Sequence, residues 1–190
     1  MKILITGANG YLGQGVVRHV LDLGYEVVAT DFTTENIDDR AEKMACDLFA
    51  IEDPYNYFKK PDVLLHLAWR DGFVHYSDAH INDLPKHYEF IKKFTQSDIK
   101  KIVGMGSMHE IGFFEGSINE DTQCNPVTPY GISKNALCIY VHILNLTGFD
   151  LRNSKIQENQ QTNHPILIYR VKSLYRGFFQ SNRSINNEVV

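Results

Sequence analysis

A tyrosine and a lysine stand four residues apart in the segment Tyr130-Gly-Ile-Ser-Lys134. In a helix this spacing places both side chains on one face, so that a phenol and an ammonium become neighbours. Free tyrosine has a pKa near ~10, and a nearby cation favours the phenolate, which suits the pair to acid/base chemistry at neutral pH. The same spacing is common by chance, so the hypothesis depends on the elements that position the pair.

A glycine-rich turn, Gly7-Ala-Asn-Gly10-Tyr-Leu-Gly13, separates a short apolar run from a segment of helical period. Glycines there allow a tight turn, close approach of the main chain to a pyrophosphate, and close packing of a helix on its strand. The next apolar run ends at Asp31, eighteen residues after Gly13. That position is near the ~20-residue offset at which a carboxylate binds an adenosine ribose. The carboxylate repels a 2′-phosphate and no arginine follows at Phe32 or Thr33, so the pattern predicts NAD rather than NADP.

The elements around these motifs alternate between apolar runs of strand length and longer segments of helical period. Strands are predicted at residues 3–6, 26–31, 43–46, 63–68 and 102–106, and helices at residues 11–23, 82–95 and 132–146. Alternation of this kind is typical of βαβ units. The predicted fold is α/β, a doubly wound parallel sheet with helices on both faces.

The composition is that of one globular domain: 190 residues, 43% hydrophobic, 22% charged, with a net charge of −4. Nucleic acid is an improbable partner, because no sustained basic stripe occurs in the first three quarters of the chain. The first apolar run is too short for a signal peptide or a membrane span, so we expect a cytoplasmic protein. The cysteines Cys46, Cys124 and Cys138 are odd in number and widely spaced, which predicts buried free thiols.

The predicted helix at 132–146 carries apolar side chains around most of its circumference. Such a helix needs cover on more than the side that a sheet provides. The cover is either a second subunit or the remaining segments of the same chain. We favour a homodimer formed through the helices at 82–95 and 132–146.

The histidines divide into two groups. His75, His80 and His87 have no accompanying pattern of cysteines or carboxylates, so we expect surface or capping residues and no metal site. His109, next to Glu110 and near Ser107, is a candidate auxiliary proton carrier.

Taken together and in order, the motifs resemble those of the extended short-chain dehydrogenase/reductases, specifically the NAD-dependent epimerase/dehydratase group that acts on nucleotide sugars. The resemblance covers roughly residues 1 to 150 and is carried by Thr6–Gly13, Asp31, Asp47-Leu48, His66-Leu67-Ala68, Ser107 and Pro129–Lys134. It implies a Rossmann-type fold with an NAD-binding domain at residues 1–151, NAD as cofactor and a nucleotide sugar as substrate.

The resemblance also implies a role for each matching position. The cofactor would be held at Gly7, Gly10, Tyr11, Leu12 and Gly13 near the pyrophosphate, at Asp31 on the adenosine ribose, at Asp47 and Leu48 beside the adenine, and at Leu67 and Ala68 along the cleft. Ser107 would bind the sugar oxygen undergoing oxidation. Tyr130 would be the catalytic acid/base, and Lys134 would bind the nicotinamide ribose. Asn82 resembles an asparagine that begins a helix in the family, where its role is structural.

The resemblance implies hydride transfer from the sugar to NAD through a keto-sugar, followed in an epimerase by return of the hydride to the other face. Dehydratases of the group carry an acidic pair after the hydroxyl residue, but Met108 and His109 stand there. This disfavours dehydration. Trp69 replaces a small residue of the family beside the cleft, a difference that bears on substrate size.

The character of the chain changes near Arg152. Residues 1–151 carry 13 basic and 21 acidic side chains, whereas residues 152–190 carry 6 and 2 and match no later family motif. We expect an atypical tail at 152–190, from truncation or a shifted reading frame, with the substrate-binding portion largely missing. The alternative is a short variant whose tail forms a strand at Ile166–Val171. A non-catalytic NAD-binding domain, acting as a sensor or as an inactive fragment, and a one-way sugar or ketone reductase therefore stay open.

Overall fold

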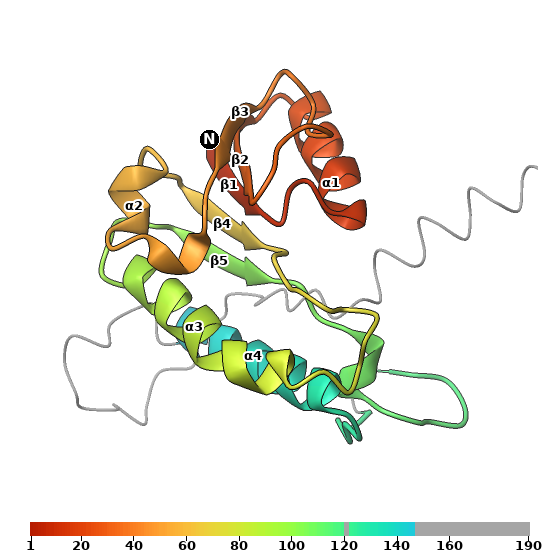
Figure 1. The fold of residues 1–190 in the computed structure, drawn as a ribbon. Coiled ribbons are helices and arrows are strands. Elements are labelled where there is room, and N and C mark those ends of the chain that lie inside the picture. The colour runs from red at the N-terminus through yellow and green to blue at the C-terminus, as the bar shows by residue number, and fades with distance from the viewer. Residues whose placement is uncertain (120–121, 147–190) are drawn as a thin grey trace, which may run out of the picture.

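The computed structural model describes residues 1–119 and 122–146, and these contain one parallel sheet with helices packed on it (Figure 1). The strands are β1 (Lys2–Thr6), β2 (Glu26–Asp31), β3 (Glu42–Ala45), β4 (Val63–His66) and β5 (Lys101–Gly104). They lie in the order β3-β2-β1-β4-β5. Each overlaps a predicted strand, so the predicted parallel sheet is confirmed. The tail at 152–190 and its alternative strand lie outside the described residues.

The described residues contain four helices: α1 (Tyr11–Asp22), α2 (Pro54–Tyr57) and α3 (Ala79–Phe94) between strands, and α4 (Pro129–Leu146) after the last strand. Two short 3₁₀ turns, η1 (Leu48–Ala50) and η2 (Met108–Glu110), follow β3 and β5. The three predicted helices are present. The prediction that Asn82 begins a helix is wrong, because α3 starts at Ala79 and Asn82 lies in its first turn, with its amide bonded to the Asp78 carbonyl.

The side chains of the strands alternate between two hydrophobic clusters, one on each face of the sheet. Ile3 and Ile5 of β1 pack with Val17 of α1. Leu4, between them, packs on the other face with Phe90 of α3 and Leu137 of α4. Figure 1 shows α1 on one side of the sheet and α3 with α4 on the other. This is the predicted doubly wound arrangement.

Helix α4 buries one apolar face and exposes another. Leu137, Val141 and Leu144 are buried against the sheet and α3. Ile132, Ile139 and Ile143 on the same helix are about half exposed, with 47%, 51% and 46% of their surface accessible. Within the described residues, therefore, the chain does not cover the outer face of this helix.

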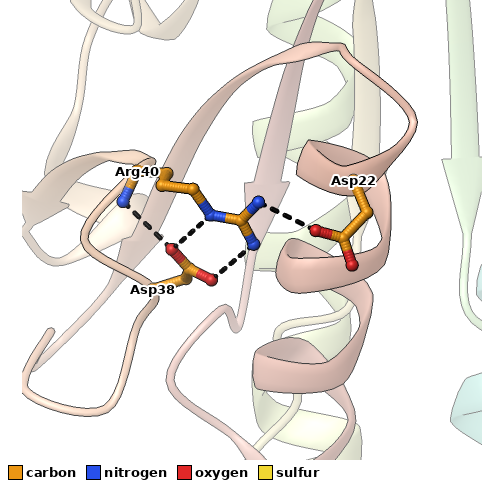
Figure 2. A network of polar contacts seen from close by, with 3 residues as sticks. All are labelled: Asp22, Asp38 and Arg40. Carbon is orange, nitrogen blue, oxygen red and sulfur yellow. Dashed lines mark hydrogen bonds and ion pairs between the residues drawn. The ribbon is translucent and has the colours of Figure 1, made fainter.

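The segment between β2 and β3 is tied back to α1 by one arginine (Figure 2). The guanidinium of Arg40 donates to Oδ1 of Asp22 at 2.8 Å, and to both carboxylate oxygens of Asp38 at 3.0 and 2.8 Å. These hydrogen bonds hold the pKa of Asp38 well below its usual range. The network is exposed, so it fixes the course of this segment and adds little to stability.

No disulfide joins the three cysteines, all of which lie in the described residues, and they are not fully buried as predicted. Cys46, Cys124 and Cys138 each retain part of their accessible surface. Cys46 lies at the edge of the larger cluster, and burial raises the pKa of its thiol. In the part of the chain that the structure describes, no helix is both long enough and apolar enough to cross a membrane.

Candidate active site

The predicted site residues lie on the loops that leave the carboxyl ends of the strands. These ends are level with one another, because Thr6 pairs with Thr30 of β2 and with His66 of β4, and His66 pairs with Gly104 of β5. The chain runs from β1 to β2 and β3 on one side, and then crosses to β4 on the other side of β1. Open α/β sheets bind ligands at this reversal of strand order.

The glycine turn after β1 has room for no side chain at two positions. Gly7 has φ of +68°, and a β-carbon there would lie 2.6 Å from the amide nitrogen of Ala68 on the neighbouring loop. A β-carbon on Gly13 would lie 2.1 Å from the carbonyl oxygen of Gly7. Both distances are below any real contact. The turn therefore has the tight geometry that the sequence predicts, with the main chain exposed on its outer side.

The first turn of α1 is open to an anion. Gly10 is the N-cap residue and offers no side-chain hydrogen bond, and the turn contains no acidic residue. Tyr11 and Leu12 are 86% and 54% exposed. The first amides of a helix have no partner inside it and carry its positive dipole end. The start of α1 can therefore receive a phosphate group.

Asp31 ends β2 directly beside this turn. Its carboxylate accepts hydrogen bonds from the amides of Asn9 at 3.0 Å and Phe32 at 2.8 Å. Each carboxylate oxygen has a second lone pair for a ligand hydroxyl. The basic side chain of the following segment, Arg40, is held by Asp22 and Asp38.

The residues expected near an adenine and along the cleft differ in exposure. Asp47 is exposed and caps η1 by accepting from the amide of Phe49 at 3.0 Å. The side chain of Leu48 lies in the core, 7% exposed. Leu67 and Ala68 are partly buried and pack against opposite clusters. Asp47 is therefore the accessible member of this pair, and Leu48 is a core residue.

Ser107 begins η2 in a reciprocal capping arrangement. Its hydroxyl oxygen accepts from the amide of His109 at 3.3 Å, and the buried carboxylate of Glu110 accepts from the Ser107 amide at 2.6 Å. The hydroxyl proton is left to donate elsewhere. A β-carbon on Gly131 would lie 2.3 Å from the His109 carbonyl oxygen, so η2 is packed against the start of α4.

Tyr130, in the first turn of α4, is surrounded by four aromatic rings. The ring centroids of His75, His80, His109 and Trp69 lie 5.4, 5.1, 5.3 and 6.3 Å from its own. Its amide also donates to the carbonyl of His75 at 3.1 Å. The sequence placed His109 and Trp69 near the site, whereas His75 and His80 were not assigned to it. Burial, and to a lesser degree the charge of His75, lowers the pKa of His109.

Lys134 lies one turn further along α4 and is 4% exposed. Its ammonium is 4.5 Å from the centroid of the Trp69 ring, which also contacts Tyr130. The tyrosine and the lysine therefore share one face of the helix, as their spacing predicts. Burial lowers the pKa of Lys134 to about 8, while the charge of Glu110 acts in the opposite direction.

Two histidines expected at the surface are buried, so that prediction is wrong. His80 and His87 are 1% and 3% exposed, on the inner face of α3. Hydrogen bonds of 2.8 Å join Thr6 Oγ1 to His66 Nδ1 and His66 Nε2 to His87 Nδ1. The signal was present in the sequence: His80, His87 and Phe94 are seven residues apart and share one helical face. Nowhere in residues 1–119 and 122–146 do His, Cys, Asp or Glu form a group of three that could hold a metal ion.

Known proteins resemble this chain in sequence and in fold. It is 43% identical over 142 residues to a dTDP-6-deoxy-L-talose 4-dehydrogenase (NAD(+)) of Aggregatibacter actinomycetemcomitans, covering 72% of this chain and 53% of that protein. It is 27% identical over 179 residues to a putative UDP-glucose 4-epimerase of Methanocaldococcus jannaschii, covering 84% of this chain and 57% of that protein. The chain thus spans little more than half the length of these relatives.

Solved structures support the fold. The UDP-glucose 4-epimerase of Thermus thermophilus, in a complex with NAD, superimposes with a TM-score of 0.67 at 24% identity, over 77% of this chain and 51% of that one. Residues 3–153 match the NAD dependent epimerase/dehydratase family. Since this match spans most of the chain, and the Rossmann-type sheet agrees with it, the protein belongs to the NAD dependent epimerase/dehydratase family.

Proposed function

We propose that residues 1–151 are the NAD-binding domain of an oxidoreductase that removes a hydride from a nucleotide sugar. One observation carries the proposal: Tyr130 and Lys134 share a helix face, against which the Ser107 turn is packed, at the end of the sheet where the glycine turn lies. An acid/base, a cation and a hydroxyl donor are the side chains that oxidation of an alcohol requires.

The residues present fit NAD. The lack of a β-carbon at Gly7 and Gly13 lets the turn pack tightly on its own main chain and on Ala68, and the first amides of α1 lie where they can meet a pyrophosphate. Asp31 holds the adenosine ribose hydroxyls, and its charge disfavours a 2′-phosphate. Asp47, Leu48, Leu67 and Ala68 complete the adenine and cleft contacts. NAD, when bound, supplies the hydride acceptor.

The chain's own residues handle the proton. Tyr130 as phenolate takes the hydroxyl proton of the sugar while the carbon-bound hydrogen leaves as hydride, which yields a ketone. Ser107 donates a hydrogen bond to the sugar oxygen. Lys134 places a positive charge beside the phenolate and binds the nicotinamide ribose. His109, whose ring contacts Tyr130, is an auxiliary proton carrier.

Two outcomes of this chemistry are candidates. An epimerase returns the hydride to the other face of the ketone, so it consumes no net cofactor. A one-way dehydrogenase or reductase accumulates NADH or NAD, and the 43% identical relative, itself named a 4-dehydrogenase, favours this second candidate. Met108 and His109 in place of an acidic pair disfavour dehydration. The absorbance at 340 nm during reaction with a nucleotide sugar distinguishes the epimerase from the one-way enzyme, because only the one-way enzyme produces a net change.

The proposal also includes self-association of the domain. The exposed isoleucines of α4, together with Ile81 and Tyr88 of α3 at 47% and 37% exposure, form an apolar surface that a second copy of the chain would cover. The proposed assembly is a homodimer through α3 and α4.

The test is binding and turnover measured separately. Calorimetry with NAD reports the cofactor site, and a subsequent titration with UDP-glucose and a dTDP-sugar reports the substrate site. A domain that binds NAD without turnover is expected to bind NAD but neither nucleotide sugar. Tyr130→Phe is expected to keep the NAD affinity and lose at least about 10²-fold in hydride transfer. Wild-type rates in this variant would contradict the assigned acid/base role.

A further inference from the structure

Trp69 is the single tryptophan of the chain, and its ring lies against the Tyr130–Lys134 pair. It follows Ala68 on the loop after β4. Its indole lies 4.5 Å from the Lys134 ammonium, stacks on His87 with ring centroids 4.5 Å apart and 12° between planes, and lies 6.3 Å from the ring of Tyr130. It is thus in contact with both members of the Tyr130–Lys134 pair.

Lys134 needs a partner for its charge, because a buried ammonium is costly unless something compensates it. In the described part of the chain, no carboxylate comes within ion-pair distance of Lys134. Glu110 acts on it at longer range and accepts a hydrogen bond from the Ser107 amide. The indole face is the direct contact, and tryptophan is the best of the aromatic side chains at attracting a cation.

The histidines behind the indole are arranged so that they add no competing positive charge. Trp69 Nε1–H can only donate, so His80 Nδ1 accepts its 3.0 Å hydrogen bond, and we assign the proton to Nε2, which donates to the Val74 carbonyl at 3.0 Å. Burial, and then the charge of Lys134, lowers the pKa of His87 to about 4. The low pKa keeps the His87 ring neutral near pH 7, and the hydrogen bonds of His80 leave its one proton on Nε2. The two rings fix the indole plane by stacking and hydrogen bonding.

We propose that Trp69 is a positioning residue for Lys134: its ring, braced by His80 and His87, holds the ammonium in place where no carboxylate of the described residues lies within ion-pair distance. The proposal rests on the proposed function only for the claim that Lys134 serves hydride transfer. The contact itself is a property of the protein without cofactor and can be tested apart from it.

The cofactor-free test uses the emission of the only tryptophan. If the ammonium sits on the indole, its deprotonation changes Trp69 fluorescence with a midpoint near the Lys134 pKa of about 8. The titratable groups that surround the pair from all packed elements are His66, His75, His80, His87, His109, Glu110, Tyr130 and Cys138. Lys134→Met is expected to abolish the transition, and Cys138→Ala and His109→Gln to retain it. A transition that persists in Lys134→Met, or none in the wild type, would overturn the contact.

The second test concerns the active protein. Trp69→Leu is expected to lower NAD affinity by about tenfold in calorimetry, and to move the alkaline limb of the kcat profile to lower pH, because the cation has lost its partner. Trp69→Phe keeps an aromatic face and should stay within about threefold of wild type. Phe73→Leu, which removes a 94% exposed ring from the same loop, is the matched control.

The two tests distinguish the failures. A wild-type pH profile and affinity in Trp69→Leu would show that the ring does not position Lys134. Absence of NAD turnover in the wild type would refute the proposed function and leave the fluorescence result to decide the contact. If Trp69→Leu does not fold, the fluorescence of Lys134→Met, which keeps Trp69, still decides it.

Discussion

A β-carbon on Gly7 would lie 2.6 Å from the amide nitrogen of Ala68, so the loops after β1 and β4 touch through their main chains. These strands are neighbours, and each is followed by a segment assigned to the cofactor. The contact lies beside the reversal of strand order, next to the first turn of α1, where Tyr11 and Leu12 are exposed.

Substitution of Gly7 by alanine should damage both stability and NAD binding. The new β-carbon meets main chain that has no room to move, at a φ of +68° that disfavours any L side chain. We expect a loss of about 2–4 kcal/mol in the free energy of unfolding, measured by urea denaturation. Gly15→Ala, in α1 with nothing within 4 Å, is the control and should gain about 0.5–1 kcal/mol. Similar effects at both positions would contradict the close contact.

Substitution of Asp31 by alanine should change cofactor preference. In the proposed function the carboxylate binds ribose hydroxyls and repels a 2′-phosphate, so calorimetry should show a loss of about tenfold or more in NAD affinity and little loss for NADP. Asp39→Ala is a control in the segment that follows β2, where the carboxylate pairs with Lys43. Equal losses for both dinucleotides would show that Asp31 does not hold the ribose.

The buried histidine pair should make the protein sensitive to acid. Burial and the charge of Lys134 lower the pKa of His87 from 6.5 to about 4, so between these values the unfolded chain binds a proton that the folded chain does not. Stability therefore falls as the pH falls from 6.5 to about 4, by roughly 2–3 kcal/mol for this residue.

Unfolding measured across that range should show a flatter curve for His87→Phe. Burial, then the charges of His87 and Lys134, also holds the pKa of His66 well below its usual range, so part of the dependence remains in this variant. His19→Gln, which changes an exposed histidine of α1, should follow the wild-type curve. An unchanged slope in His87→Phe would refute the burial of a neutral ring.

The apolar surface of α3 and α4 predicts self-association. Ile139→Glu places a charge at a half-exposed position of that surface, so sedimentation should show monomer where the wild type sediments as a dimer. Leu23→Glu, a 59% exposed position beside α1, should leave the dimer intact. A monomeric wild type would contradict the interface.

Local sequence patterns predicted most of the fold. The strands, α1 and the glycine turn are set by short-range periodicity and by conformations that glycine alone adopts, so each is readable within about a dozen residues. Helix α2 has four residues, too few to show a period. The early start of α3 at Ala79 depends on the loop that precedes it, and the side chain of the N-cap residue Asp78 makes no hydrogen bond to the helix.

The candidate site was only partly predictable for a different reason. Some site residues belong to motifs that are recognisable from their spacing in the sequence alone: Asp31, Ser107, Tyr130 and Lys134. The aromatic rings around Tyr130 and the stacking of Trp69 on His87 come from segments that are far apart in the sequence. Only tertiary packing brings the loop after β4, α3 and the start of α4 together. His80 and His87 were predicted at the surface because histidine is polar. Their seven-residue spacing with Phe94, which places all three on one helical face, was the better guide, because both histidines are buried.

The most direct test of the central claim is a crystal structure of the protein with NAD. The account predicts the pyrophosphate at the first turn of α1, the adenosine ribose on Asp31, and the nicotinamide ring beside the Tyr130 hydroxyl. An empty crevice, or a nicotinamide ring out of reach of Tyr130, would contradict it.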